Sequence, residues 1–169
     1  FKQLIMSLLA LKQDDKDKYG TYVSILCDKN TKTLLDKFID LNIELNEKID
    51  PSSYHCTIIC SHIQIPSAEI LIVPQNIIAY ATGYDLLTTK TGGKCLVMIL
   101  NCHEASRLNK LLIQHGAISD FDDYKPHITI CYNYVGNGNL TKLPIPKFDI
   151  IFDQYEVKSL DQNFIPQNK

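Results

Sequence analysis

One pattern occurs twice in this chain, and this duplication limits the possible folds more than any other feature. Each copy reads as a strand, a helix and a second strand. Each second strand contains a histidine and a threonine separated by one residue: His55 with Thr57, and His127 with Thr129, the two histidines being 72 residues apart. We therefore expect the chain to fold into two similar halves.

The first copy opens with a β-rich segment at 22–27 and closes with another at 54–60. Between them, either Asn30 or Thr31 can cap a helix. Apolar residues spaced by four, three and four positions predict the buried face of that helix: Leu34, Phe38, Leu41 and Leu45.

The second copy opens with a continuous apolar run at 95–100, typical of a strand buried on both faces, and closes with a segment at 124–131. Asn101 and Glu104 resemble a capping box at the start of the intervening helix. We expect the helix to end at Gly116 in a left-handed conformation. Its predicted buried residues are Ala105, Leu108 and Leu112.

Three more segments have strand character: 69–73, 76–89 and 148–160. The whole pattern predicts an α+β fold, with duplicated strand-helix-strand lobes and two antiparallel sheets around a central cleft. No linker divides the chain, so we expect a single domain over residues 1–169. Its lobes would cover about residues 20–75 and 76–165.

The His-x-Thr spacing decides where these side chains point. Residues two apart on a strand share a face, so each histidine projects together with its threonine. If the two strands lie side by side, two imidazoles and two hydroxyls meet in one cleft. One neutral and one protonated imidazole can serve phosphodiester transfer as base and acid, while the hydroxyls hold phosphate oxygens. Such a site needs no metal ion and no other cofactor. The competing interpretation is a pair of surface histidines on two edge strands.

Composition narrows the class of partner. The net charge is -2 and the pI about 6.2, which disfavours duplex DNA or long RNA and leaves a ligand with a few phosphates. No apolar run approaches the ~20 residues that span a bilayer, and we expect no signal peptide and no membrane partner. The six cysteines lack a Cys-x-x-Cys pair, which predicts buried, reduced thiols in a cytoplasmic protein.

The paired motifs, in a duplicated α+β chain of this size, resemble the two-histidine (2H) phosphoesterase superfamily. The pattern is more similar still to the bacteriophage anti-CBASS phosphodiesterases, which degrade the cyclic di- and trinucleotide messengers of bacterial antiphage immunity. The segments that carry this narrower resemblance are 18–22 with 28–30, 55–57 and 125–129. It implies a metal-independent enzyme that is encoded by a phage and acts in the bacterial cytoplasm on a small cyclic oligonucleotide.

The resemblance also implies roles for the motif residues. A ribose 2′-hydroxyl would attack the adjoining 3′–5′ phosphodiester. His55 and His127 would be the base and the acid, in an order that the sequence leaves open. Thr57 and Thr129 would bind the phosphate.

Other positions match the family's nucleobase contacts. Tyr22 could stack on a base, with Tyr19 as the alternative, and Glu156 could accept a hydrogen bond from an exocyclic amine. Core packing for Tyr22 and a solvated strand position for Glu156 stay equally open. Lys125 could reach a phosphate or be a solvated loop charge. Because the chain has no Trp, Phe164 is the late aromatic residue left for a C-terminal lid.

Two other functions remain open on the sequence alone. One is a 2H enzyme that acts on linear 2′,5′-oligoadenylate or on RNA ends with a 2′,3′-cyclic phosphate. The other is a non-catalytic protein that sequesters nucleotides. Both intact motifs favour an enzyme, because binding alone needs neither an acid nor a base.

Overall fold

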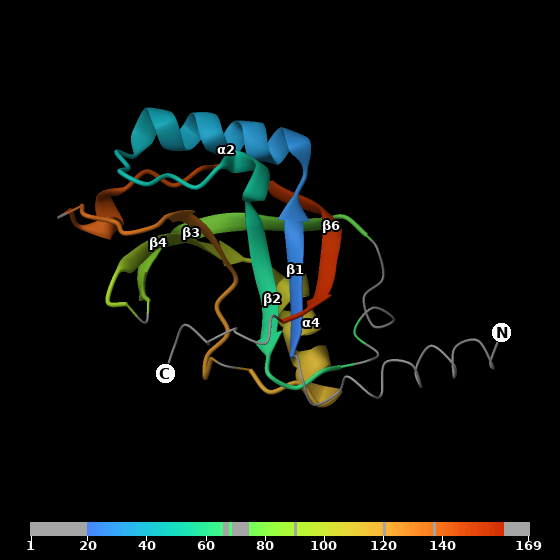
Figure 1. Cartoon of the computed structure of the whole chain (residues 1–169). Helices are drawn as coiled ribbons and strands as arrows, with labels where there is room; N and C mark the ends of the chain where they lie inside the picture. Colours follow the sequence, from blue (N-terminus) through green and yellow to red (C-terminus); the bar gives the residue numbers. More distant parts are fainter. Residues whose placement is uncertain are drawn as a thin grey trace, which may run out of the picture.

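The computed structural model describes residues 20–65, 68, 75–89, 91–119, 121–136 and 138–160. The strands of these residues pair antiparallel throughout and close into a ring in the order β1, β2, β5, β4, β3, β6. Figure 1 shows β1 between β2 and β6. The bounds are β1 Thr21–Cys27, β2 His55–Ser61, β3 Ile77–Thr88, β4 Lys94–Asn101, β5 His127–Cys131 and β6 Ile150–Ser159.

The strand order preserves the duplication that the sequence predicts. Strands β6, β1 and β2 form one half of the ring, and β3, β4 and β5 form the other. Each half has its opening strand, β1 or β4, in the centre and its His-x-Thr strand at one side. The two His-x-Thr strands are therefore neighbours.

The halves join at two short seams, so one closed ring replaces the two separate sheets that we expected. At the first seam the register pairs Cys56 of β2 with Ile128 of β5. At the second seam β3 pairs with β6, for example Ile77 with Phe152. The physical reason is that separate sheets would leave four edges with unpaired backbone groups, which the seams satisfy in part. The α+β class and the antiparallel pairing are confirmed.

The first helix, α2 (Lys29–Asn42), starts earlier than either predicted cap and buries a different face. The carboxylate of Asp28 caps it by accepting the Thr31 N–H at 2.6 Å. The exposed fraction of Leu41 is 83%, so the predicted buried face was wrong. Thr31 lies on the buried face, where its Oγ1 accepts the Ile151 N–H of β6 at 3.1 Å. The buried residues are Thr31, Leu35 and Ile39.

The second helix, α4 (His103–Gln114), confirms the predicted buried face but not the predicted cap. Asn101 ends β4 instead, and its Nδ2 donates to the Tyr80 hydroxyl at 2.6 Å. Gly116 has a φ of 102°, which confirms the left-handed end. Asn109 joins the buried face and donates to the Ile58 carbonyl of β2 at 2.8 Å. The buried residues are Ala105, Leu108, Asn109 and Leu112.

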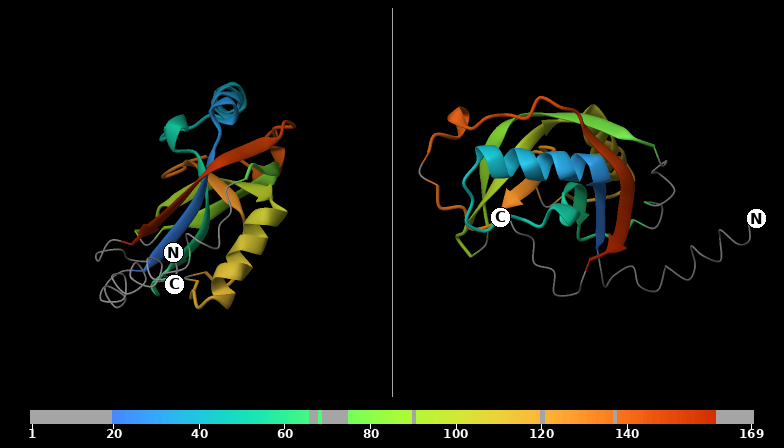
Figure 2. Two further views of the ribbon diagram at one scale, coloured as in Figure 1. Left: turned by 90° about the vertical axis from the view of Figure 1, so that its right-hand side faces the viewer. Right: turned by 90° about the horizontal axis from the view of Figure 1, so that it is seen from above.

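The two helices lie on different sides of the ring, α2 at the top of the view and α4 at the bottom (Figure 1; Figure 2). No helix among the described residues is long and apolar enough to cross a bilayer. All six cysteines are buried and free, as predicted. The strand expected at 69–73 lies outside the described residues.

Candidate active site

Strands β2 and β5 present both His-x-Thr motifs on one face. Cys56 and Ile128 pair across the first seam, and both side chains are fully buried. Paired residues of antiparallel strands point to the same side, whereas their neighbours along each strand point to the other side. The half-buried side chains therefore share the opposite face: His55, Thr57, His127 and Thr129. Continuing the register places Thr57 opposite His127, and His55 opposite Thr129.

The imidazole of each motif histidine is oriented by a hydrogen bond between Nδ1 and a backbone carbonyl. Nδ1 of His55 lies 2.7 Å from the Ser53 carbonyl oxygen, and Nδ1 of His127 lies 2.7 Å from the Lys125 carbonyl oxygen. A carbonyl can only accept, so both Nδ1 atoms carry a proton and donate. In both rings Nε2 is left as the nitrogen that takes up or releases a proton.

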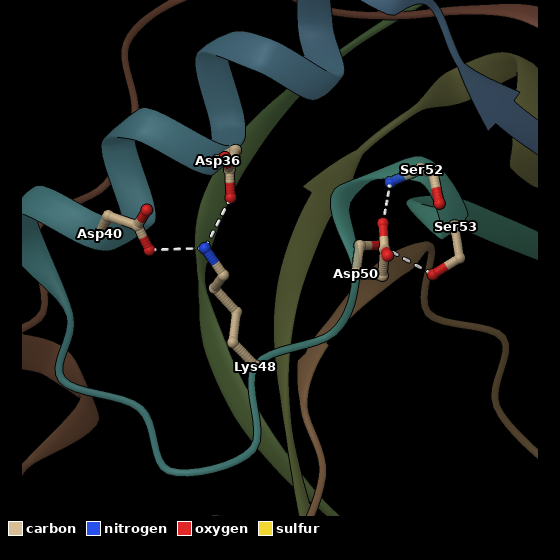
Figure 3. Close-up of polar contacts among 6 residues, drawn as sticks. All are labelled: Asp36, Asp40, Lys48, Asp50, Ser52 and Ser53. Atoms are coloured by element: carbon tan, nitrogen blue, oxygen red, sulfur yellow. Dashed lines mark hydrogen bonds and ion pairs between the residues drawn. The ribbon is translucent and has the colours of Figure 1, made fainter.

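The turn before His55 is itself well anchored (Figure 3). The Asp50 carboxylate accepts the Ser52 N–H at 2.8 Å, and the Ser53 hydroxyl donates to the Asp50 carbonyl at 2.8 Å. This short 3-10 turn, Pro51–Ser53, presents the Ser53 carbonyl to His55.

An ion-paired lysine fixes the segment that leads into this turn. Lys48 Nζ lies 2.6 Å from a carboxylate oxygen of Asp36 and 2.6 Å from one of Asp40, both on α2 (Figure 3). These hydrogen bonds raise the pKa of Lys48. The same segment bonds to the end of β5, since Ile49 N–H donates to the Ile130 carbonyl at 3.0 Å. One segment thus connects the approach to His55 with the strand of His127.

A cavity of about 340 Å³ opens where β2 and β5 part beyond the paired residues. Thr57, His127 and Lys125 line this cavity. Apolar side chains from β2, β3, β4 and the loop before β5 line much of the rest: Ile59, Leu87, Ile99 and Phe121. Two carboxylates, Asp85 and Asp123, also line it. An apolar cavity with a few polar groups is typical of a small-molecule site.

Burial lowers the pKa of His127 below its ordinary value. The Lys125 carbonyl and the charge of Asp85 act in the opposite direction, and a positive charge on His55 lowers the pKa further. The interaction between the two histidines follows from their place on neighbouring strands. His127 is therefore predominantly neutral near pH 7.

Tyr22 of β1 lies against the first motif. Its hydroxyl is 3.0 Å from Thr57 Oγ1, and burial raises its pKa. The ammonium of Lys158 lies 5.1 Å from the centre of the Tyr22 ring, within the range of a cation–π interaction. Lys158 also forms an ion pair with Glu156 at 2.9 Å. The structure thus brings Tyr22 and Glu156 to one edge of the site, with Lys158 between them.

Of the other predicted positions, Lys125 lines the cavity and is exposed, while its carbonyl holds His127. Tyr19 and Phe164 lie outside the described residues. The sequence analysis did not assign Asp85, Tyr124 or Lys158 to the site, because none of the three belongs to a His-x-Thr motif. One signal was available for Lys158: it shares its strand face with Glu156, two residues earlier.

Within the described part of the chain, no three His, Cys, Asp or Glu side chains are placed to hold a metal ion. The chemistry of the site is that of two imidazoles, two threonine hydroxyls and the groups that orient them.

Comparison with known proteins identifies a protein family whose model matches most of this chain. Residues 19–167 match the family model described as "Anti-CBASS protein Acb1". A protein of that name from Vibrio phage KVP40 is 27% identical over 152 residues, which are 90% of this chain and 95% of the relative.

Solved structures show the same fold at low sequence identity. The E. coli LigT structure in complex with 3′-AMP has a TM-score of 0.54 and 14% identity, covering 83% of this chain and 86% of LigT. A structure described as a phosphoesterase has a TM-score of 0.57 and 13% identity, covering 84% of this chain and 88% of that protein. The fold is therefore LigT-like.

Proposed function

Because the chain belongs to the anti-CBASS Acb1 family, as its motifs predicted, we propose that it is a metal-independent phosphodiesterase. It cleaves the 3′–5′ bonds of cyclic di- and trinucleotide second messengers, and so counters bacterial antiphage immunity. One observation carries the proposal: His55 and His127 lie on neighbouring strands, and each has Nδ1 bound to a carbonyl and Nε2 left for proton transfer. The name of the phage relative, an anti-CBASS protein, supports the role against bacterial antiphage immunity.

The reaction is a transfer within the substrate. Nε2 of the neutral imidazole takes the proton of a ribose 2′-hydroxyl, and O2′ forms a bond to the adjoining phosphorus. The P–O5′ bond breaks, and Nε2–H of the protonated imidazole gives its proton to O5′. The ring opens to a linear product with a 2′,3′-cyclic phosphate and a 5′-hydroxyl. Proton transfer of this kind accelerates reactions by roughly 10²–10⁴-fold.

The lowered pKa of His127 favours it as the base, because that imidazole is neutral before the reaction starts. His55 is then the acid. Thr57 and Thr129 donate to the non-bridging phosphate oxygens, where negative charge grows. The Tyr22 hydroxyl supports this role: when it donates to Thr57 Oγ1, the Thr57 proton is left for the phosphate.

The cavity beside Thr57 and His127 takes one nucleoside of the substrate. Its apolar wall suits the faces of a base, and the carboxylates of Asp85 and Asp123 can accept hydrogen bonds from an exocyclic amine. Lys125 at the rim can reach a phosphate. Lys158 of β6 already lies over the ring of Tyr22 on β1, so a base that stacks there meets the other face or displaces the ammonium. Glu156 remains a candidate for a second base contact.

A cleavage assay in EDTA tests the proposal. The substrates are 3′,3′-cyclic dinucleotides, cyclic triadenylate and linear 2′,5′-triadenylate. We expect the wild-type protein to open cyclic substrates, and H55A and H127A each to lose the activity. H115A is the matched control, since Nδ1 of His115 also bonds a carbonyl, that of Leu111 at 2.9 Å, on the exposed end of α4.

Each alternative has its own result. Cleavage of the linear substrate alone would move the assignment to a 2′,5′-oligoadenylate enzyme. Tight binding without turnover would identify a nucleotide-sequestering protein. Activity that EDTA abolishes, or that survives in both histidine variants, would refute the mechanism.

A further inference from the structure

The two motif strands are joined by very little backbone pairing. Among the described residues of β2 and β5, the register pairs only Cys56 with Ile128. Such a short seam defines the position of Thr57 relative to His127 weakly, although a reaction shared between the two strands depends on it. The segment at Lys48 and Ile49 links the two strands near His55, and a group that ties them together beside Thr57 and His127 would add a constraint at the other end of the seam.

The side chain of Tyr124 makes such a tie. Tyr124 precedes β5 in the chain, and its hydroxyl donates to the Thr57 carbonyl of β2 at 2.9 Å. The same hydroxyl lies 3.8 Å from Cys56 Sγ, directly behind the paired residues. Burial raises the pKa of Tyr124, so the phenol stays protonated and able to donate throughout the working pH range.

The backbone next to Tyr124 holds His127. The Lys125 carbonyl accepts Nδ1–H of His127 at 2.7 Å, and the Pro126 carbonyl accepts the Leu100 N–H of β4 at 2.9 Å. The three-residue segment 124–126 is thus attached to β2 at one end and to β4 at the other. The carbonyl that orients His127 lies between these two attachments.

We propose that Tyr124 is a positioning residue that holds the His127 imidazole in register with Thr57 through its hydrogen bond to the Thr57 carbonyl. It touches no reacting atom. Its kinetic consequence rests on the proposed function, because it acts through the histidine and threonine of that reaction. Without the hydroxyl, the loop and β2 separate, water enters the seam, and the geometry needed for proton transfer is populated less.

The test is Y124F, which keeps the ring and removes only the hydroxyl. A small misplacement of a catalytic group is costly, so we expect kcat to fall about tenfold or more while KM stays within about twofold. NMR titration of the imidazoles should show the pKa of His127 moving up toward its ordinary value, because water relieves the burial that lowers it.

The matched control is Y84F. Tyr84 of β3 is also half-buried, and its hydroxyl donates to a backbone carbonyl outside β2 and β5, that of Pro144, at 2.6 Å. We expect this variant to keep wild-type kcat and an unchanged His127 titration. Both variants are compared well below their thermal midpoints. The wild-type protein offers a second measurement, since the Tyr124 hydroxyl proton should exchange slowly with solvent.

Unchanged kcat and an unchanged His127 titration in Y124F would overturn the proposal, as would equal losses in Y84F or a rapidly exchanging Tyr124 hydroxyl in the wild type. If the wild-type protein cleaves no nucleotide, the proposed function fails, yet the titration still decides whether Tyr124 positions His127.

Discussion

At the scale of single residues, burial has the largest effect on the pKa of His127, and nearby charges modify it. Burial lowers this pKa, and the Lys125 carbonyl and, to a smaller extent, the charge of Asp85 on β3 oppose that effect. The net effect is a lowered pKa, so the imidazole is predominantly neutral near pH 7. Asp85 thus influences the pKa of His127 although it belongs to neither motif.

This balance gives a prediction for D85N. Asparagine keeps an oxygen for the Leu86 N–H, which the Asp85 carboxylate accepts at 2.8 Å, but it removes the negative charge. A carboxylate stabilises the protonated imidazole, so its removal should lower the pKa of His127 further. NMR titration should show the shift. The limb of the pH–rate profile that reports His127 should move to lower pH by the same amount.

The control is D153N, on the exposed part of β6, because Asp153 is not among the groups that shift the pKa of His127. An upward shift in D85N, or an equal shift in D153N, would contradict the prediction.

The motif residues could be proposed from the sequence because their spacing is local. A period of two residues places His55 with Thr57 on one face whatever the rest of the chain does. Asp85 and Tyr124 could not be found in this way. Asp85 reaches the cavity through the pairing of β3 with β4, and Tyr124 through the closure of the seam, and both contacts join distant segments.

At the scale of the elements, each helix is attached to a strand by one buried polar side chain. Thr31 of α2 accepts from the Ile151 N–H of β6, and Asn109 of α4 donates to the Ile58 carbonyl of β2. These links satisfy backbone groups that strand pairing leaves free. They also fix the two helices to the two outer strands, β6 and β2, of the same half of the ring.

The variant T31V tests the α2 attachment. Valine has nearly the same shape as threonine but leaves the Ile151 N–H without its acceptor, which should lower the free energy of unfolding by about 1–3 kcal/mol. Urea denaturation measures the loss. T33V makes the same chemical change on the exposed face of α2, where Thr33 Oγ1 donates to the Lys29 carbonyl, and should cost less than about 0.5 kcal/mol. Equal decreases in the free energy of unfolding in T31V and T33V would contradict the role of Thr31 in attaching α2 to β6.

The strands were easier to predict than the packing of α2. Runs of β-branched and apolar residues are visible locally, and β1 and β4 begin within one residue of the expected positions. In α2, however, two apolar stripes lie one residue apart, and only one faces the strands. The buried stripe includes the polar Thr31, whose hydrogen bond to β6 cannot be inferred from periodicity.

At the scale of the whole molecule, the duplication divides the chemistry between the halves. His55 comes from the half with β1 and β6, and His127 from the half with β3 and β4. In the proposed mechanism, neither half therefore contains both the catalytic acid and the catalytic base. Closure of the ring at the β2–β5 seam therefore brings the two histidines together. For this reason we expect a group that holds the seam, such as Tyr124, to have a large effect on the site.

The charge of the whole molecule gives the last prediction. With a net charge of -2, we expect the attraction for phosphates to be local, provided by Lys125 at the cavity and Lys158 beside Tyr22. Two phosphate contacts predict that log Kd changes with log salt by a slope of only about 1.4, since each contact with a single strand contributes about 0.7. Isothermal titration of a cyclic dinucleotide into H55A, at several salt concentrations, measures the slope.

K125A should lower the slope by about 0.7, the contribution of one phosphate contact, whereas K110A, on the exposed surface of α4, should leave the slope unchanged. A long single-stranded RNA should compete poorly, because it gains little from further contacts. A steep slope, or strong competition by the RNA, would instead indicate an extended basic surface and a polymeric substrate.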